Sequence, residues 1–361
     1  MDNTYRELLK YINETQEIAT RALQCFDKNA DFRIIDSLDL GVPYDVDRLA
    51  GGFPTGVYVY WHCKEPIIPV DTTVNCCSAS VFLLGKIEEF DEPKYIDRLK
   101  NINSIWKDGS YLMNFDRGNH FISLCVDEDE EYYLIMHSTA KEFTKGYNGL
   151  YPIKGNWYYD KIKVYQKGKK YFRYINGKEA VLFRNTAKFL NQYNEIRHEN
   201  IAYSILKELN INIVNVEHFH HYGMDNDNSI KIGCYTLDKN SVFPIFSKPS
   251  YFIDIFRISK CSKQTEDGKY IVPHGWGKHM IKPLNICCDF DNRQFFMGGE
   301  SFDILSNDNF YRLPNLVYRD YERIGGENYF YEYYKAELEG TIFKRLSQKI
   351  CMSASGIQQY L

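Results

Sequence analysis

The chain has 361 residues, a formal net charge of −4 and an aromatic content of 16% that includes 30 tyrosines. This length accommodates one large domain or two ordinary ones, and a hydrophobic content of 44% predicts a well-packed globular core. The weakly acidic charge balance excludes a general basic field, so any nucleic-acid partner has to be held by a local patch.

The cysteines and the N-terminal segment indicate a reducing compartment. Ten cysteines in a chain of this length do not form the dense framework of a small secreted protein. The N-terminal segment is charged and lacks the apolar core of a signal peptide, and no apolar run approaches the length of a membrane span. We therefore expect reduced thiols, a cytoplasmic location and no membrane partner.

The first part of the chain predicts one helix followed by strands. Apolar residues at helical spacing predict an amphipathic helix over residues 2–26. From Gly52 the pattern becomes that of strands, and a hairpin follows in which residues 127–131 form the turn. The expected strands cover residues 56–60, 67–70, 80–85, 121–126 and 132–136.

The second part mixes hairpins, one long helix and more strands. Residues 151–184 have the aromatic-rich composition of β-hairpins, with turns expected at Gly155, Lys167–Gly168 and Asn176–Gly177. The longest helical pattern covers residues 186–209, and strands are expected at 211–216, 230–237 and 251–258. Because no repeat, low-complexity tract or linker is present, the simplest architecture is a single α+β domain over residues 1–361, with residues 1–50 as a helical lead-in.

Histidines gather beside the expected strands and turns. Seven of the nine lie in four places: His120, His137, the cluster His218, His220 and His221, and the pair His274 and His279. In the expected hairpin, His120 begins one strand and His137 ends its neighbour, so the two imidazoles can lie at the same rim. In the cluster, His218 and His220 share one face of a strand and His221 takes the other. A satisfied core or surface imidazole is the alternative for each. We expect His198 to be a solvated helix residue.

Cys76 and Cys77 form an adjacent pair. Such a pair rarely supplies two ligands to one ion, so we expect one thiolate to bind and the other to pack. The chain contains no CxxC pair, which argues against an ordinary structural zinc ribbon. One cysteine, several histidines and Asp71 are typical of a catalytic transition-metal site with open positions.

The segment 271–278 places His274 between Pro273 and Gly275, with Lys278 four residues further on. A neutral imidazole can attack phosphorus and form a phosphoramidate, and a lysine can neutralise phosphate. A turn with an incidental histidine explains this segment equally well on its own.

Taken in order, these segments resemble the motifs of the RtcB family of RNA ligases. The resembling segments are Asn75–Cys76, Gly118–Phe121, Met136–Ser138, His220–Tyr222, Lys231–Gly233 and His274–Lys278, followed by residues 314–324 and 338–344. Each motif is degenerate, but six or seven in the right order are hard to obtain by chance. The resemblance runs from about Pro69 to Lys344.

The resemblance implies an RtcB-like mixed domain with a metal cleft at strand ends. RtcB enzymes use Mn²⁺ and GTP to join an RNA 3′-phosphate or 2′,3′-cyclic phosphate to a 5′-hydroxyl, through a histidine–GMP intermediate, in RNA repair and tRNA splicing. The implied metal ligands are Cys76, His120, His137 and His220, and the implied nucleophile is His274. The implied nucleotide contacts are Asn119, Lys141, Lys278 and Lys344.

Departures from the family pattern leave alternatives open. The family's aspartate before the metal-binding cysteine is here Thr73, so one or two Mn²⁺ ions remain possible, and His218 is the second choice to His220. The lysines between 161 and 170 could contact RNA or form a solvated hairpin. The alternative functions are a degenerate ligase-like protein that binds a nucleotide or RNA end, and a metal-dependent phosphoester hydrolase. The oligomeric state is left open.

Overall fold

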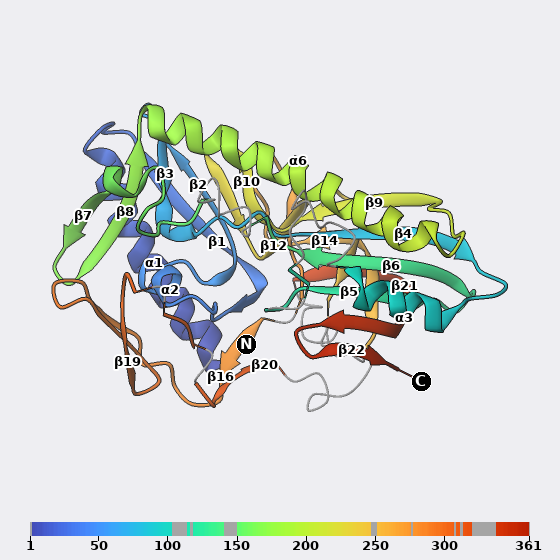
Figure 1. Ribbon diagram of the computed structural model, residues 1–361. Coiled ribbons are helices and arrows are strands. Elements are labelled where there is room, and N and C mark those ends of the chain that lie inside the picture. The colour runs from blue at the N-terminus through green and yellow to red at the C-terminus, as the bar shows by residue number, and fades with distance from the viewer. Residues whose placement is uncertain are drawn as a thin grey trace.

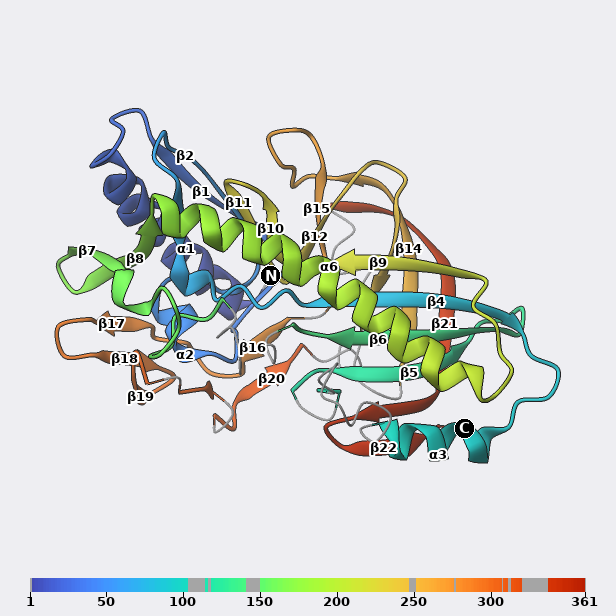
Figure 2. The same ribbon diagram turned by 45° about the horizontal axis from the view of Figure 1, so that its top comes forward.

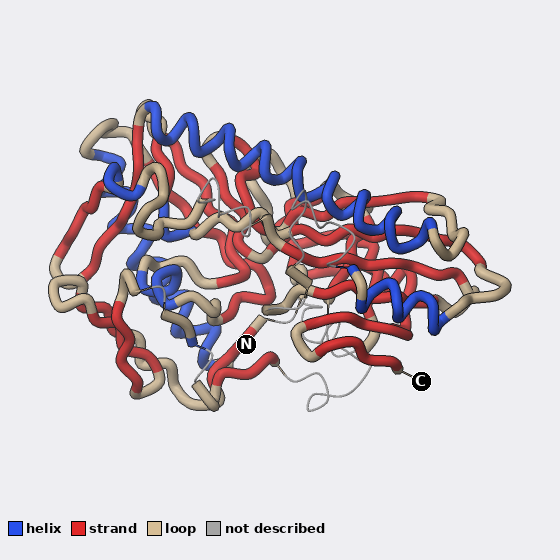
Figure 3. Tube along the Cα trace, in the orientation of Figure 1, coloured by secondary structure: helices blue, strands red, loops and turns tan. Residues whose placement is uncertain are grey.

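The longest helix, α6 (Lys178–Lys207), runs along one side of the molecule and spans both of its halves (Figure 1). The structure is a computed structural model. It describes residues 2–102, 114–115, 118–140, 150–246, 251–275, 277–306, 308–310, 313–319 and 337–360. The fold is mixed α+β, with far more strand than helix among these residues, as Figure 3 shows.

The first helix, α1 (Asn3–Gln24), confirms the prediction for residues 2–26. It begins after Asp2, whose side chain accepts a hydrogen bond from the backbone N–H of Tyr5 at 2.8 Å and so satisfies one free donor of the first turn. The other helical elements are α2 (Val46–Ala50), α3 (Glu92–Lys100) and the short 3₁₀ turns η1 (Val70–Thr72) and η3 (Tyr159–Lys161).

The largest sheet has eight strands, all paired antiparallel. Its strands are β4 (Ser78–Lys86), β5 (Phe121–Val126), β6 (Glu131–Ser138), β9 (Asn215–His220), β13 (Val242–Ile245), β14 (Ile253–Cys261), β21 (Leu338–Ser353) and β22 (Gly356–Gln359). They follow the order β13-β14-β21-β5-β6-β4-β9, with β22 added to β21. The hairpin expected around residues 121–136 is confirmed as β5 and β6.

The two faces of this sheet bury different cores. On one face Phe82 and Leu134 pack against α3 and the C-terminal half of α6, where Ile201 and Ile205 are fully buried. On the other face the sheet curls over a second cluster that includes Ile135. Alternate residues of each strand therefore point either to α6 or to the inside of the curl.

A second sheet of four strands lies in the other half of the molecule, together with α1 and α2 (Figure 2). Its strands are β1 (Asp31–Gly41), β2 (Thr55–His62), β11 (Ser229–Ile232) and β10 (Tyr222–Asn226), in that order. The smaller sheets contain β3 (Ile67–Pro69), β7 (Lys163–Lys167), β8 (Lys170–Asn176), β12 (Cys234–Leu237), β15 (Tyr270–Pro273), β16 (Lys278–Met280), β17 (Cys287–Asp289), β18 (Gln294–Met297), β19 (Glu300–Asp303) and β20 (Leu316–Tyr318).

Several of the secondary-structure predictions were wrong in detail. The strand expected over residues 211–216 lies at Asn215–His220 as β9, and the lead-in expected to be helical over residues 1–50 contains the strand β1. Residues 151–162 contain no strand, and only the hairpin of β7 and β8, with its turn at Gly168, is present. Gly177 does not form a hairpin turn. It is the N-cap of α6, with a φ of 64°, so this helix starts at residue 178 and not at residue 186 as expected. The strand expected over 230–237 is broken at Gly233, where φ is 74°.

None of the ten cysteines forms a disulfide, which agrees with the expectation of reduced thiols. Within the described ranges, no helix combines the length and the apolar character needed to cross a membrane.

Candidate metal centre

Three strand ends meet at one edge of the large sheet. Cys77 immediately precedes β4, His137 is the penultimate residue of β6, and His221 immediately follows β9. In the ladder, Ser78 of β4 is opposite both Ser138 of β6 and His220 of β9. This common register brings the three side chains to the same rim although they are far apart in the sequence.

Side-chain alternation decides which residues face inward. Ser78 accepts a hydrogen bond from Asn194 of α6, and Ser138 accepts one from Arg197 of the same helix. Nε2 of His220 lies 2.6 Å from Oε1 of Glu195, which is also in α6. Since neighbouring residues of a strand point to opposite faces, the residues one position away point into the curl of the sheet. Those residues are Cys77, His137 and His221.

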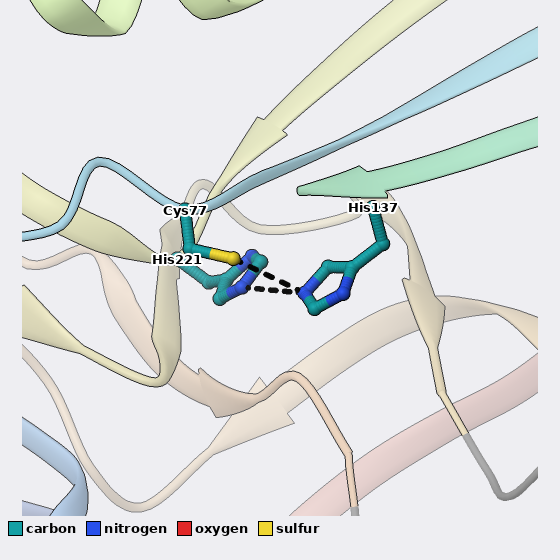
Figure 4. Close-up of side chains that lie close together, drawn as sticks. All are labelled: Cys77, His137 and His221. Carbon is teal, nitrogen blue, oxygen red and sulfur yellow. Dashed lines mark hydrogen bonds between the residues drawn. The ribbon is translucent and has the colours of Figure 1, made fainter. Parts of the chain in front are cut away.

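The three inward side chains converge on one point, as Figure 4 shows. Nε2 of His137 lies 3.3 Å from Sγ of Cys77 and 3.1 Å from Nε2 of His221. All three residues are buried, and their ligand atoms lie within 4.8 Å of one another.

Two of the three spacings are close to those around a shared metal ion. For tetrahedral zinc, metal–sulfur and metal–nitrogen bonds of about 2.3 and 2.05 Å place two nitrogens about 3.3 Å apart and a sulfur about 3.5 Å from a nitrogen. The observed distances are about 0.2 Å shorter in both cases. Three protein donors also leave a fourth position for water or a substrate oxygen, as in catalytic sites.

The hydrogen bond of His137 sets its tautomer. Nδ1 lies 2.9 Å from the backbone oxygen of Asn119, which can only accept, so Nδ1 carries the proton and Nε2 keeps its lone pair. Burial, reinforced by the neighbouring His120, lowers the pKa of His137 to about 3. Burial likewise holds the pKa of His221 well below its ordinary value. Both imidazoles are therefore neutral at physiological pH, which is the state that binds metal.

His120 lies beside this cluster without belonging to it. Its ring centroid is 6.0 Å from that of His137, edge to face, and it is buried. Its Nδ1 donates to the backbone oxygen of Asn114 at 2.9 Å, so Nε2 keeps a lone pair. His120 can therefore serve as an additional donor at the edge of the centre.

His274 continues the stack of imidazoles. Its ring lies 4.7 Å from that of His221, and the two rings are tilted by only 16°. His137 and His221 are stacked with the same tilt at 5.0 Å. Nδ1 of His274 donates to Oδ2 of Asp39 at 2.9 Å, so Nε2 is the nitrogen with the lone pair.

Asp39 is a functional candidate that the sequence interpretation missed. Its side chain is fully buried, and among the described residues its Oδ1 has no hydrogen-bond partner. A buried carboxylate with one unsatisfied oxygen is costly and is expected near a cation or a reacting group. The signal available in the sequence was an aspartate between two leucines, Leu38 and Leu40. In the structure, residues 37–41 of this strand are all buried.

Two of the expected metal ligands lie outside the cluster. Sγ of Cys76 points to the backbone oxygen of Ala187 in α6, and burial raises the pKa of its thiol to about 12. His220 faces Glu195, as described above, and His218 is likewise turned to Glu199 of α6 at 2.9 Å. The residues that lie with His137 in the cluster are Cys77 and His221, each one position away from an expected ligand.

Asp71 and Lys344 also lie elsewhere. Asp71 is fully buried in an ion pair with Arg173. Lys344 is paired with Asp127 and Glu131 at the turn between β5 and β6. Since His137 is six residues along β6 from Glu131, that turn is about 20 Å from the cluster.

The other three residues implied to contact the nucleotide lie in different settings. Asn119 contributes its backbone oxygen to His137, and its side chain is exposed. Lys278 is buried with its Nζ 3.0 Å from the ring centre of Tyr44 and 4.6 Å from that of Tyr318, and burial lowers its pKa to about 7. Lys141 lies outside the described residues.

One further prediction, about solvation, was wrong, and the two alternatives for the basic hairpin stay open. His198 is not solvated: it is fully buried, with Nδ1 2.7 Å from Oγ of Ser80 and Nε2 2.6 Å from Oγ of Ser138. In the basic hairpin, lysines 167, 169 and 170 pair with Glu17, Asp289 and Glu14 of the same chain. These three lysines are thus partly neutralised.

The chain matches no protein-family model, and no curated protein is significantly similar to it.

Proposed function

We propose that this protein is a metal- and GTP-dependent RNA ligase of the RtcB type, joining RNA 3′-phosphate or 2′,3′-cyclic phosphate ends to 5′-hydroxyl ends. The observation that carries this proposal is the position of His274. Its imidazole is stacked on His221 of the cluster. Nδ1 carries the proton and donates a hydrogen bond to Asp39, so the lone pair of Nε2 is available.

This arrangement suits nucleophilic attack on phosphorus. In the proposed first step, Nε2 of His274 forms a bond to the α-phosphorus of GTP, and the bond from that phosphorus to the pyrophosphate oxygen breaks. The imidazole gains positive charge as the bond forms. The carboxylate of Asp39, 2.9 Å from Nδ1, stabilises that charge and holds the ring in one orientation.

Cys77, His137 and His221 would hold a divalent transition metal, with His120 as an additional donor. Sulfur and imidazole donors suit such an ion, and Mn²⁺ is the one implied by the resemblance. When bound, the metal would act as a Lewis acid on phosphate oxygens. The histidines contribute by staying neutral in a buried setting, since a protonated imidazole can neither bind metal nor attack phosphorus.

The base of the nucleotide needs a separate test. Lys344, the residue implied to contact guanine, is paired with Asp127 and Glu131 at the distant turn. Both nucleotides belong in the assay.

The test is RNA joining by the purified protein. An RNA with a 2′,3′-cyclic phosphate end and an RNA with a 5′-hydroxyl end are incubated with Mn²⁺ and GTP, and the product is resolved on a denaturing gel. We expect a joined strand with the native protein and none with His274→Ala. A matched control is His279→Ala, since His279 lies in the same segment but pairs with Asp2.

The alternative functions predict other outcomes. Release of phosphate without joining would favour the phosphoester hydrolase. Binding of GTP or of the RNA end without either reaction would favour the degenerate binding protein. Absence of joining in protein that is loaded with metal contradicts the ligase proposal.

A further inference from the structure

The side chain of Asn194, in the middle of α6, reaches the edge of the sheet where the metal centre lies. It is fully buried. The two protons of its Nδ2 are shared among three acceptors: Oγ of Ser78 at 2.6 Å, the backbone oxygen of Ser138 at 3.0 Å and that of Cys76 at 3.3 Å. These contacts come from two strands that are not consecutive in the sequence.

Each contacted group is next to a candidate ligand. The oxygen of Cys76 and the hydroxyl of Ser78 lie on either side of Cys77, and Ser138 directly follows His137. A single amide thus fixes the backbone on both sides of the thiolate and behind one imidazole. Movement of either strand end by about 1 Å would break these hydrogen bonds.

The amide itself is held in one orientation. Its Oδ1 accepts a hydrogen bond from Nη2 of Arg197 at 2.6 Å, which assigns Nδ2 as the donor towards the strands. Arg197 also donates to Oγ of Ser138 and to the backbone oxygen of Thr139. The guanidinium is buried, so it has little freedom to move away.

We propose that Asn194 is a positioning residue that sets the separation of Cys77 and His137 and thereby the affinity of the centre for its metal. The proposal rests on the metal-binding part of the proposed function. It does not depend on GTP or RNA. Polar groups behind metal ligands fix ligand orientation, and their removal typically lowers affinity by about 10- to 100-fold.

The experiment is a titration of the apo protein with Co²⁺, whose thiolate charge-transfer absorption reports the cobalt–sulfur bond. We expect Asn194→Ala to bind Co²⁺ about 10-fold more weakly than the native protein and to show a shifted or weaker charge-transfer band. Gln192→Ala, which removes an exposed amide from the same helix, should leave both unchanged. Thermal unfolding of each apo variant separates a loss of fold from a loss of affinity.

Because Asn194 is buried, its alanine variant can fail to fold. In that case Ser78→Ala provides the test of the positioning role. That change removes only the closest acceptor of the amide and should weaken Co²⁺ binding a few-fold. A folded Asn194→Ala, or in its absence a folded Ser78→Ala, with native affinity and spectrum overturns the proposal. If the native protein itself shows no charge-transfer band, the metal centre is wrong, which is a different failure.

Discussion

The imidazoles of His221 and His274 lie nearly parallel, with ring centroids 4.7 Å apart, although the two residues follow strands of different sheets. His221 follows β9 of the large sheet and His274 follows β15 of a small one. The contact joins the candidate metal ligands to the candidate nucleophile. Substitutions of the two histidines should have different effects, because His221 lies at the point on which Cys77 and His137 converge and His274 does not.

The adjacent cysteines should respond differently to substitution. Cys77→Ala should abolish the binding of one equivalent of transition metal, since the sulfur at 3.3 Å from His137 is lost. Cys76→Ala should keep the metal, because its sulfur points to Ala187. Elemental analysis of both variants, purified without chelator, provides the measurement. Equal metal content in the two would remove Cys77 from the centre.

Asp39→Asn should slow the transfer of GMP to the protein. The amide cannot offset the charge of the imidazole and can hold the wrong tautomer, so we expect a rate at least about 100-fold lower. Metal content should not change. Asp36→Asn is the matched control, since Asp36 lies on the same strand and pairs with Lys263 instead of His274. A native rate for Asp39→Asn would show that the pair has no role.

Lys344 should affect stability and leave nucleotide chemistry unchanged. Lys344→Met removes the cation that faces the buried carboxylate of Asp127, and this pairing now holds the pKa of Asp127 below its ordinary value. We expect unfolding to require about 1–2 kcal/mol less free energy. The affinity for GTP should stay within about twofold of native. A large loss of GTP affinity in a folded variant would return Lys344 to the nucleotide site.

The buried His198 should make stability depend on pH. Burial and the neighbouring Arg197 hold its pKa well below 6.5, so as pH falls below that value the unfolded chain takes up a proton that the folded chain does not. Its contribution to stability is therefore complete above about pH 6.5 and declines in acid by up to about 1.4 kcal/mol per pH unit.

Denaturant titrations of apo protein at several pH values test this dependence. His198→Gln cannot titrate, so its free energy of unfolding should fall less steeply than that of the native protein between about pH 6.5 and pH 5. His62→Gln, which alters an exposed histidine, should keep the native slope. Identical slopes for native protein and His198→Gln would contradict the assignment.

The sequence could predict the hairpin of β5 and β6 and the placement of histidines at its strand ends, because both depend on local pattern. Alternation of apolar residues defined β5 and β6, and the two histidines at their ends followed from strand pairing. Which cysteine and which histidine join His137 in the cluster depends on the register of β4 against β6 and β9. A shift by one residue reverses the face, which is why Cys77 and His221, and not Cys76 and His220, lie on the same side of the sheet as His137.

Contacts between residues far apart in the sequence could not be predicted from local sequence patterns. Asp39 and His274 are 235 positions apart, and no spacing rule connects them. The position of His198 was also misjudged, because an isolated histidine in a helical pattern is equally consistent with either face. Burial of its helix face against β4 and β6 supplies the two serine hydroxyls that its nitrogens need.

The most direct measurement is to locate a covalent nucleotide on the protein. Protein loaded with Mn²⁺ is incubated with GTP, denatured without acid and analysed by intact mass and then by tandem mass spectrometry of its peptides. The account predicts one added GMP, stable in alkali and labile in acid as a phosphoramidate is, on the peptide that contains His274, and its absence from His274→Ala. A metal-loaded native protein that takes up no GMP, or takes it up on another residue, would contradict the account.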